Sequence, residues 1–161
     1  MRAMSDEFSR RQWLKGALLS MSAANATVAS AAGLTVATSL PDELAAALKK
    51  GCPLLVMVNL RGCPFCKIAT ENYLLPLQRE QGIAMVQVDM RSRLLVRGFD
   101  GPPQTQDSLC RQWGIKVAPT VLFFGRHGVE VAERLVGGYL PDFYGSYLDE
   151  RVRVARIALQ A

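Results

Sequence analysis

The sequence predicts an α/β fold in which a mixed central sheet of about four strands has helices on both faces. Three observations predict it. The apolar runs 54–60 and 83–88 have the length and continuity of buried strands. A helical stretch separates them, which is the order of a parallel strand–helix–strand unit. The later runs 120–124 and 129–136 are joined by a tight turn, so they are expected to form an antiparallel hairpin.

The first two helices are predicted from their caps and breaks. Residues 39–42 (Ser-Leu-Pro-Asp) are typical of a helix start, and the helix continues from Glu43 to Lys50, where Gly51 ends it. The next helix is expected from Cys63 to about Gln81, with a kink at Pro76. Its inner face is expected to hold four apolar side chains, Ile68, Tyr73, Leu74 and Leu77.

The stretch 91–106 interrupts this pattern with Arg91, Arg93, Arg97 and the pair Pro102-Pro103. It reads as a long loop, and loops of this length are usually functional or mobile. A short helix from Asp107 to Trp113 follows and ends at Gly114. The last element is an amphipathic helix from Asp142 to about Leu159.

The motif Cys63-Pro64-Phe65-Cys66 stands between the first strand and its helix. Two thiols at this spacing can bond to each other, and the unpaired N–H groups of a helix start favour the thiolate. Cys63, at the first position, is therefore the expected nucleophile, and Cys66, one turn inside, the resolving sulfur. Pro64 restricts the loop, and Phe65 offers an apolar face to a substrate. The pattern indicates electron exchange between dithiols.

A second motif, Val117-Ala118-Pro119-Thr120, opens the strand 120–124. Proline is expected only at the first residue of a strand or in an edge strand. The peptide bond before a proline is also the one for which the cis form costs little free energy. A trans proline that merely starts the strand is the alternative.

The two motifs and the order of elements over residues 40–158 resemble the thioredoxin superfamily. This resemblance implies a thioredoxin fold, a cis Pro119 packed against the dithiol, and an Ala118 backbone that pairs with the substrate segment. Several further runs are similar to periplasmic thioredoxin-like proteins of sulfur oxidation and cytochrome maturation: Phe99-Asp100-Gly101, Gly128 and Gly137-Gly138-Tyr139.

The resemblance implies an enzyme, a thiol–disulfide oxidoreductase that acts on a protein with a disulfide or dithiol and needs no dissociable cofactor. Net reduction is preferred because the similar proteins are reductants, and the redox partner would then be a membrane electron donor. Pro64-Phe65 also suits an oxidant that forms disulfides. The chain departs from thioredoxins at two positions: Met57 replaces a buried acidic residue, and Gly62 replaces a tryptophan.

A thioredoxin-like module that binds metal without redox turnover is the rival interpretation. Zinc requires four ligands, there is no second C-x-x-C, and Cys52, Cys110 and His127 are scattered, so no metal site is expected. Cys52 and Cys110 are expected to fill core space, with a disulfide between them as the alternative. His127 is expected to be exposed in a turn. Four aromatics are expected to be core or capping residues: Trp113, Tyr139, Phe143 and Tyr147.

Residues 1–31 are expected to be an export signal, and residues 32–161 a single thioredoxin-like domain. Ser9-Arg10-Arg11-Gln12-Trp13-Leu14-Lys15 resembles the twin-arginine motif, and the weakly apolar stretch 16–28 is too short and polar for a confident membrane span. Small residues at 24–26 and 29–31 offer cleavage sites. The predicted compartment is the periplasm, with membrane anchoring if the signal is retained. An amphipathic tail with coincidental arginines is the alternative.

The net charge of +5 is too mild to indicate nucleic-acid binding, and no aromatics are interleaved with Lys or Arg. An isomerase would need a dimerisation segment, and the sequence shows none. A monomer is therefore expected.

Overall fold

The computed structural model describes residues 33–138 and 141–160, without the side chains of residues 141 and 142. The export signal predicted for residues 1–31 and the aromatic residue Tyr139 lie outside this range. Within it, no helix combines the length and the apolar character that crossing a membrane requires.

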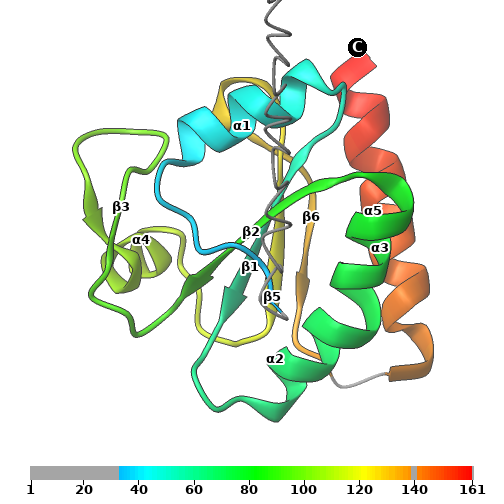
Figure 1. Cartoon of the computed structure of the whole chain (residues 1–161), viewed down its shortest axis with the longest axis horizontal. Coiled ribbons are helices and arrows are strands. Elements are labelled where there is room, and N and C mark those ends of the chain that lie inside the picture. The colour runs from blue at the N-terminus through cyan, green and yellow to red at the C-terminus, as the bar shows by residue number, and fades with distance from the viewer. Residues whose placement is uncertain (1–32, 139–140, 161) are drawn as a thin grey trace, which may run out of the picture. The chain divides into compact units, whose positions relative to one another are not determined.

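One mixed sheet forms the centre of the domain (Figure 1). Its strands stand in the order β2-β1-β5-β6, with bounds Ala84–Asp89, Leu54–Asn59, Thr120–Phe124 and Glu130–Val136. β1 is parallel to β2, and β5 is antiparallel to both β1 and β6. The pairing of β5 with β6 is irregular, with register shifts on either side of Phe123. A four-stranded mixed sheet with β1 inside it confirms the predicted fold class.

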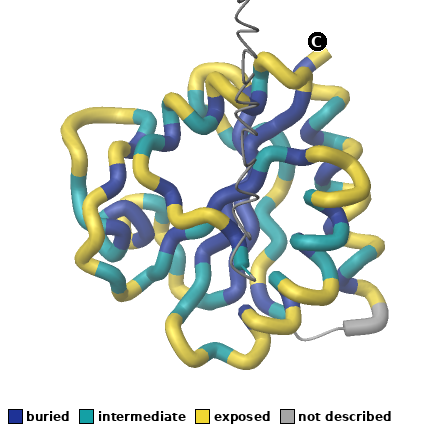
Figure 2. The backbone as a smooth tube through the Cα atoms, in the orientation of Figure 1, coloured by how far each residue is buried: buried dark blue, intermediate teal, exposed yellow. Residues whose placement is uncertain are grey.

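Side chains of β1 alternate between two hydrophobic clusters, one on each face of the sheet. Leu55 and Met57 belong to the cluster with α2, α3 and α5, whereas Val56 and Val58 belong to the cluster with α1 and α4. Figure 2 shows the buried backbone concentrated in the sheet. The helices have these bounds: α1 Leu40–Lys49, α2 Pro64–Ala69, α3 Leu75–Gln81, α4 Gln106–Gln112 and α5 Pro141–Gln160.

A π-helical turn, Thr70–Leu74, joins α2 to α3 where the sequence predicted one kinked helix. It ends two residues before Pro76, which has no N–H to donate to a regular helix. The inner face of α2 consists of Cys66 and Ala69, which are buried. Ile68 stands one position before Ala69, so it points away from that face and is 42% exposed, and the prediction that Ile68 faces inward was wrong. Leu74 and Leu77 are buried as expected.

The predicted loop at 91–106 contains a small antiparallel sheet of its own, formed by β3 (Leu95–Val96) and β4 (Gln104–Thr105). Arg97 attaches it to the start of α1. Its guanidinium lies 2.9 Å from the carboxylate of Asp42, and its backbone N–H donates to the carbonyl of Thr38 at 3.0 Å. The segment is therefore tied to the body of the domain.

A stretch of chain before α1 lies along the outer edge of β2. Gln87 donates its backbone N–H to Thr35 at 2.8 Å and accepts one from Ala37 at 2.9 Å, which makes a parallel bridge at Val36. Leu34 and Ala37 are 4% and 1% exposed. These residues therefore belong to the fold.

The hairpin turn between β5 and β6 is the short 3-10 segment η2, Arg126–Gly128. His127 and Gly128 both have a left-handed backbone, with φ of 62° and 68°. A Cβ on Gly128 would lie 2.4 Å from the ring of Phe99, so this position needs glycine for space as well as conformation. His127 is exposed, as predicted.

The aromatic predictions are partly wrong. Trp113 packs on Phe124 with ring centroids 5.4 Å apart, but Phe143 and Tyr147 are 57% and 47% exposed. The reason is helical phase, because the inward stripe of α5 consists of Tyr144, Leu148, Val152 and Ala155. Cys52 and Cys110 are buried free thiols in the cluster beneath α1 and α4, which confirms that they fill core space.

Candidate active site

Cys63 lies where the turn after β1 becomes helix α2. Gly62 has φ +77°, and the backbone N–H of Cys63 closes the turn on the carbonyl of Leu60 at 3.0 Å. Cys63 is then the N-cap of α2, and its Sγ accepts a hydrogen bond from the backbone N–H of Cys66 at 3.2 Å. A helix start that donates to a sulfur stabilises negative charge there.

The Sγ atoms of Cys63 and Cys66 lie 2.6 Å apart, and the Cys66 thiol donates to the Cys63 sulfur. Cys66 is 5% exposed in the cluster that also contains Met57, whereas Cys63 is half-buried. Burial, followed by the hydrogen bond to Cys63, raises the pKa of the Cys66 thiol to about 12. The two sulfurs therefore differ in access, and the buried one keeps its proton near neutral pH.

The proline motif lies beside the dithiol. The Ala118–Pro119 peptide is cis, and the Ala118 carbonyl oxygen is 3.9 Å from the Sγ of Cys63. Pro119 is buried. Gly138 separates Pro119 from Phe65, because a Cβ on Gly138 would lie 3.4 Å from the Pro119 Cγ and 3.6 Å from the Phe65 Cβ.

All six residues singled out from the sequence therefore meet at one end of the sheet: Cys63, Pro64, Phe65, Cys66, Ala118 and Pro119. Pro64 and Phe65 are exposed, with Phe65 at 48%. They form an accessible surface beside Cys63, next to the buried cis proline.

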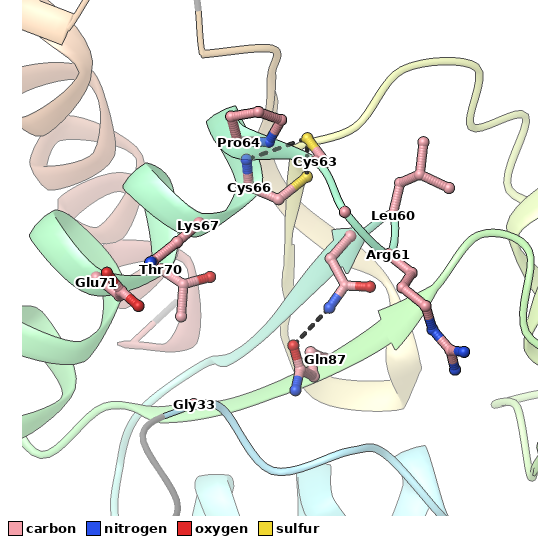
Figure 3. A pocket seen from close by; sticks show the side chains of 12 residues that line it. Gly33, Leu60, Arg61, Cys63, Pro64, Cys66, Lys67, Thr70, Glu71 and Gln87 are labelled. Carbon is pink, nitrogen blue, oxygen red and sulfur yellow. Dashed lines mark hydrogen bonds between the residues drawn. The ribbon is translucent and has the colours of Figure 1, made fainter.

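A pocket of about 560 Å³ opens on the other side of the dithiol (Figure 3). Across it, Asn59 donates to the Oε1 of Gln87 at 2.6 Å, and Gln87 in turn donates to the carbonyl of Leu34 at 2.6 Å. The Oδ1 of Asn59 is buried and has no hydrogen-bond partner among residues 33–138 and 141–160. This polar lining was not predicted from the sequence.

Asp89, at the end of β2, was also missed. Its Oδ2 accepts from the backbone N–H of Arg61 at 3.1 Å, which steadies the turn leading to Cys63, and its charge contributes to the raised pKa of Cys66. The signal was present, because polar residues at the carboxyl ends of adjacent parallel strands meet at one edge of the sheet. Asn59 and Asp89 stand opposite each other in that register.

Tyr144 of α5 is a further residue that was missed. Its ring packs on Tyr73 with centroids 5.0 Å apart, and its buried hydroxyl has no hydrogen-bond partner in the part of the chain that the structure describes. Burial raises its pKa, with a smaller contribution from Cys66. No local motif marks Tyr144, and only the periodicity of the last helix could have placed it on the inner face.

Metal-ligating side chains do not gather in the part of the chain that the structure describes: no three His, Cys, Asp or Glu residues lie close enough to hold an ion. The dithiol itself offers two sulfur ligands, whereas zinc takes four.

Solved structures with the same fold include three thioredoxins. Spinach chloroplast thioredoxin f is 18% identical with a TM-score of 0.52, over 76% of this chain and 96% of its own. Fasciola hepatica thioredoxin is 17% identical with a TM-score of 0.51, over 74% and 97%. Thioredoxin O2 of Arabidopsis thaliana in the oxidised state is 17% identical with a TM-score of 0.50, over 75% and 96%.

No curated protein matches the sequence. The family model described as the Thioredoxin-like domain matches residues 40–150, which is most of the chain, and it spans β1, the dithiol, the cis proline and the hairpin. The chain therefore belongs to the thioredoxin-like family.

Proposed function

We propose that this protein is an exported thiol–disulfide oxidoreductase that reduces a disulfide in a partner protein. The observation that carries the proposal is the pair of sulfurs 2.6 Å apart at the start of α2, one accessible and one buried, beside a cis proline. Membership of the thioredoxin-like family supports it.

The proposed reaction has two exchange steps. The Cys63 thiolate attacks one sulfur of the partner disulfide, and the other partner sulfur leaves as a thiolate and takes up a proton. Cys66 then loses its proton and attacks the Sγ of Cys63. This releases the second partner thiol and leaves a Cys63–Cys66 disulfide, so two electrons pass to the partner. Since Cys66 carries a thiol with a raised pKa, its proton must leave during the second step.

The partner segment is proposed to lie across Ala118 and Pro119 with its apolar side chains on Phe65 and Pro64. The Ala118 carbonyl is close to Cys63 and available to an added strand. A membrane electron donor would return Cys63 and Cys66 to the dithiol state. The periplasm is the proposed compartment because residues 9–15 resemble a twin-arginine signal.

Trapping tests the roles of the two cysteines. Cys66→Ser should hold a mixed disulfide between Cys63 and the partner, whereas Cys63→Ser should capture nothing, as judged by non-reducing electrophoresis and mass spectrometry. The reverse pattern would invert the assignment. Loss of insulin reduction in Cys63→Ser checks the activity, and stoichiometric bound metal in an inactive wild type would contradict the proposal.

Direction and export need separate measurements. A glutathione titration should give a reducing potential, closer to that of thioredoxin than to that of the strong oxidant DsbA. For export, Arg10→Lys together with Arg11→Lys should retain the protein in the cytoplasm of a host with a twin-arginine system. Periplasmic recovery of that double variant would contradict the signal assignment.

A further inference from the structure

The carboxylate of Asp89 joins two loops that are far apart in the sequence. Its Oδ2 accepts from the backbone N–H of Arg61 at 3.1 Å, and its Oδ1 accepts from the backbone N–H of Arg91 at 2.8 Å. The turn that leads to Cys63 and the first turn of the arginine-bearing segment therefore lie side by side, at the shared carboxyl end of β1 and β2.

We name the side chains of Arg61, Arg91 and Arg93 the basic rim. All three are exposed, and none forms an ion pair with any residue that the structure describes. Figure 3 shows Arg61 extending away from the two sulfurs, past the end of β2. By contrast, Arg97 in the same segment is paired with Asp42. The rim cations are therefore left facing solvent.

Nearby acidic groups leave the rim with a net positive charge. Asp89 keeps one negative charge, because its oxygens accept only from neutral backbone N–H groups, and the three arginines outweigh it. Glu71, on the opposite wall of the pocket, forms no ion pair with any residue that the structure describes, and Lys67 on the same wall carries the opposite charge. On the far side of Cys63 the surface is apolar, with Phe65 and Ile68 at 48% and 42% exposure. Cys63 thus stands between a basic and an apolar surface.

We infer that the basic rim selects partner proteins whose reactive disulfide is flanked by acidic side chains. The inference rests on the thiol–disulfide exchange proposed above. Arg61 precedes Cys63 by two residues, so a partner sulfur bonded to Cys63 brings its neighbouring residues over the rim. Complementary charge at such a surface accelerates association, and salt weakens the effect.

Single-turnover kinetics with defined peptides tests this inference. The reduced full-length protein is mixed with excess of three disulfide-bonded peptides that differ only in their flanking residues, which are Asp, Ser or Lys. At low salt the acidic peptide should react about tenfold faster than the neutral one, and the basic peptide more slowly, because steering by complementary charge has at least this size. High salt should bring the three rates together.

Charge reversal identifies the surface. Arg91→Glu with Arg93→Glu should remove or invert the acidic preference while leaving the neutral peptide unaffected. Lys50→Glu with Arg79→Glu makes the same change of net charge at the opposite end of β1 and β2 and should keep the preference. Urea unfolding verifies that both double variants fold, and Arg91→Gln with Arg93→Gln should give an intermediate preference.

Two outcomes would overturn the inference. If the wild type reduces all three peptides at one rate, or if the Arg91/Arg93 reversal keeps the acidic preference, the basic rim does not select partners although the exchange reaction stands. If even the neutral peptide is not reduced, the proposed exchange fails, and the inference fails with it.

Discussion

Burial in the hydrophobic core is the main cause of the raised pKa of Cys66. Its side chain is 5% exposed, and it shares a hydrophobic cluster with Met57, which is 1% exposed. The resemblance to thioredoxins implies an acidic residue where Met57 stands, so the local proton acceptor for Cys66 is replaced by an apolar side chain. In the proposed exchange, the proton of Cys66 would leave toward the polar pocket that Cys66 lines together with Asn59 and Gln87.

Alkylation should distinguish the two sulfurs. In the wild type near neutral pH, iodoacetamide should modify Cys63 well before Cys66, because Cys63 is the accessible sulfur and the Cys66 thiol has a pKa of about 12. In Cys63→Ser, modification of Cys66 should rise about tenfold per pH unit from about pH 7 to pH 10, since only the thiolate reacts. Burial, the largest cause of the raised pKa, persists in that variant.

Peptide mapping by mass spectrometry measures these rates and separates them from those of the buried Cys52 and Cys110. A Cys66 rate in Cys63→Ser that is fast and independent of pH above neutrality would contradict a raised pKa. It would also remove the reason for assigning Cys66 the resolving role.

At the scale of single residues, the sequence predicted which cysteines and which proline lie together better than it predicted their surroundings. Cys63, Cys66 and Pro119 stand in short motifs whose spacing alone carries meaning. Asn59 and Gln87 meet only because β1 and β2 pair in a particular register, which local spacing does not encode. Their contribution to the pocket therefore became visible only in the structure.

Helices were predicted well where a residue that ends a helix, such as glycine, marks their boundary. Gly51 and Gly114 mark the ends of α1 and α4, and both have a left-handed backbone. The π-helical turn at Thr70–Leu74 was not predictable in detail, because Pro76 indicates a disturbance without saying whether the helix bends or widens. Small strands such as β3 and β4 carry too few residues for a periodic pattern.

The hairpin turn offers a test of packing at the level of an element. Gly128 and Gly114 have the same φ of +68°, but a Cβ would touch Phe99 only at Gly128. Gly114→Ala should cost about 1 to 2 kcal/mol for the left-handed backbone alone. Gly128→Ala should cost a further 1 to 3 kcal/mol, roughly, because the added methyl overpacks the site.

Urea denaturation of both glycine variants measures the difference. Repeating it in a Phe99→Ala background closes a double-mutant cycle, and the extra cost at Gly128 should then disappear. If Gly114→Ala and Gly128→Ala lower the free energy of unfolding equally in the wild-type background, the Phe99 ring moves aside for the added methyl group without loss of packing.

For the whole molecule, the order of elements predicted the topology, because short right-handed connections leave few arrangements of these strands. The contribution of the chain before α1 was not predicted. The family match begins at residue 40, yet Leu34 and Ala37 are buried, and residues 35 and 37 bond to β2. A segment this short shows no detectable alternation of apolar and polar residues.

Shortening the chain should reveal where the domain starts. A protein that begins at residue 33 should keep the unfolding midpoint and insulin reduction of the full chain, because its described core lies between Leu34 and Leu159. One that begins at residue 40 should lose roughly 2 to 4 kcal/mol, since it loses a buried leucine and two backbone hydrogen bonds to Gln87.

Urea unfolding followed by circular dichroism compares the two shortened proteins with the full chain. If the protein that begins at residue 40 is as stable as the one that begins at residue 33, the bridge at Val36 contributes nothing to the fold. If the protein that begins at residue 33 is itself destabilised, residues 1–32 support the domain beyond their proposed role in export.

The bridge at Val36 also affects how folded molecules meet one another. A sheet whose lateral strands offer unpaired N–H and C=O groups is a template for aggregation. At the outer edge of β2, the backbone around Val36 already pairs with Gln87. At the opposite edge, β6 pairs irregularly with β5 and carries the charged residues Glu130, Glu133 and Arg134. Both margins are therefore poor starting points for strands from other copies, which protects the folded protein from forming fibres at high concentration.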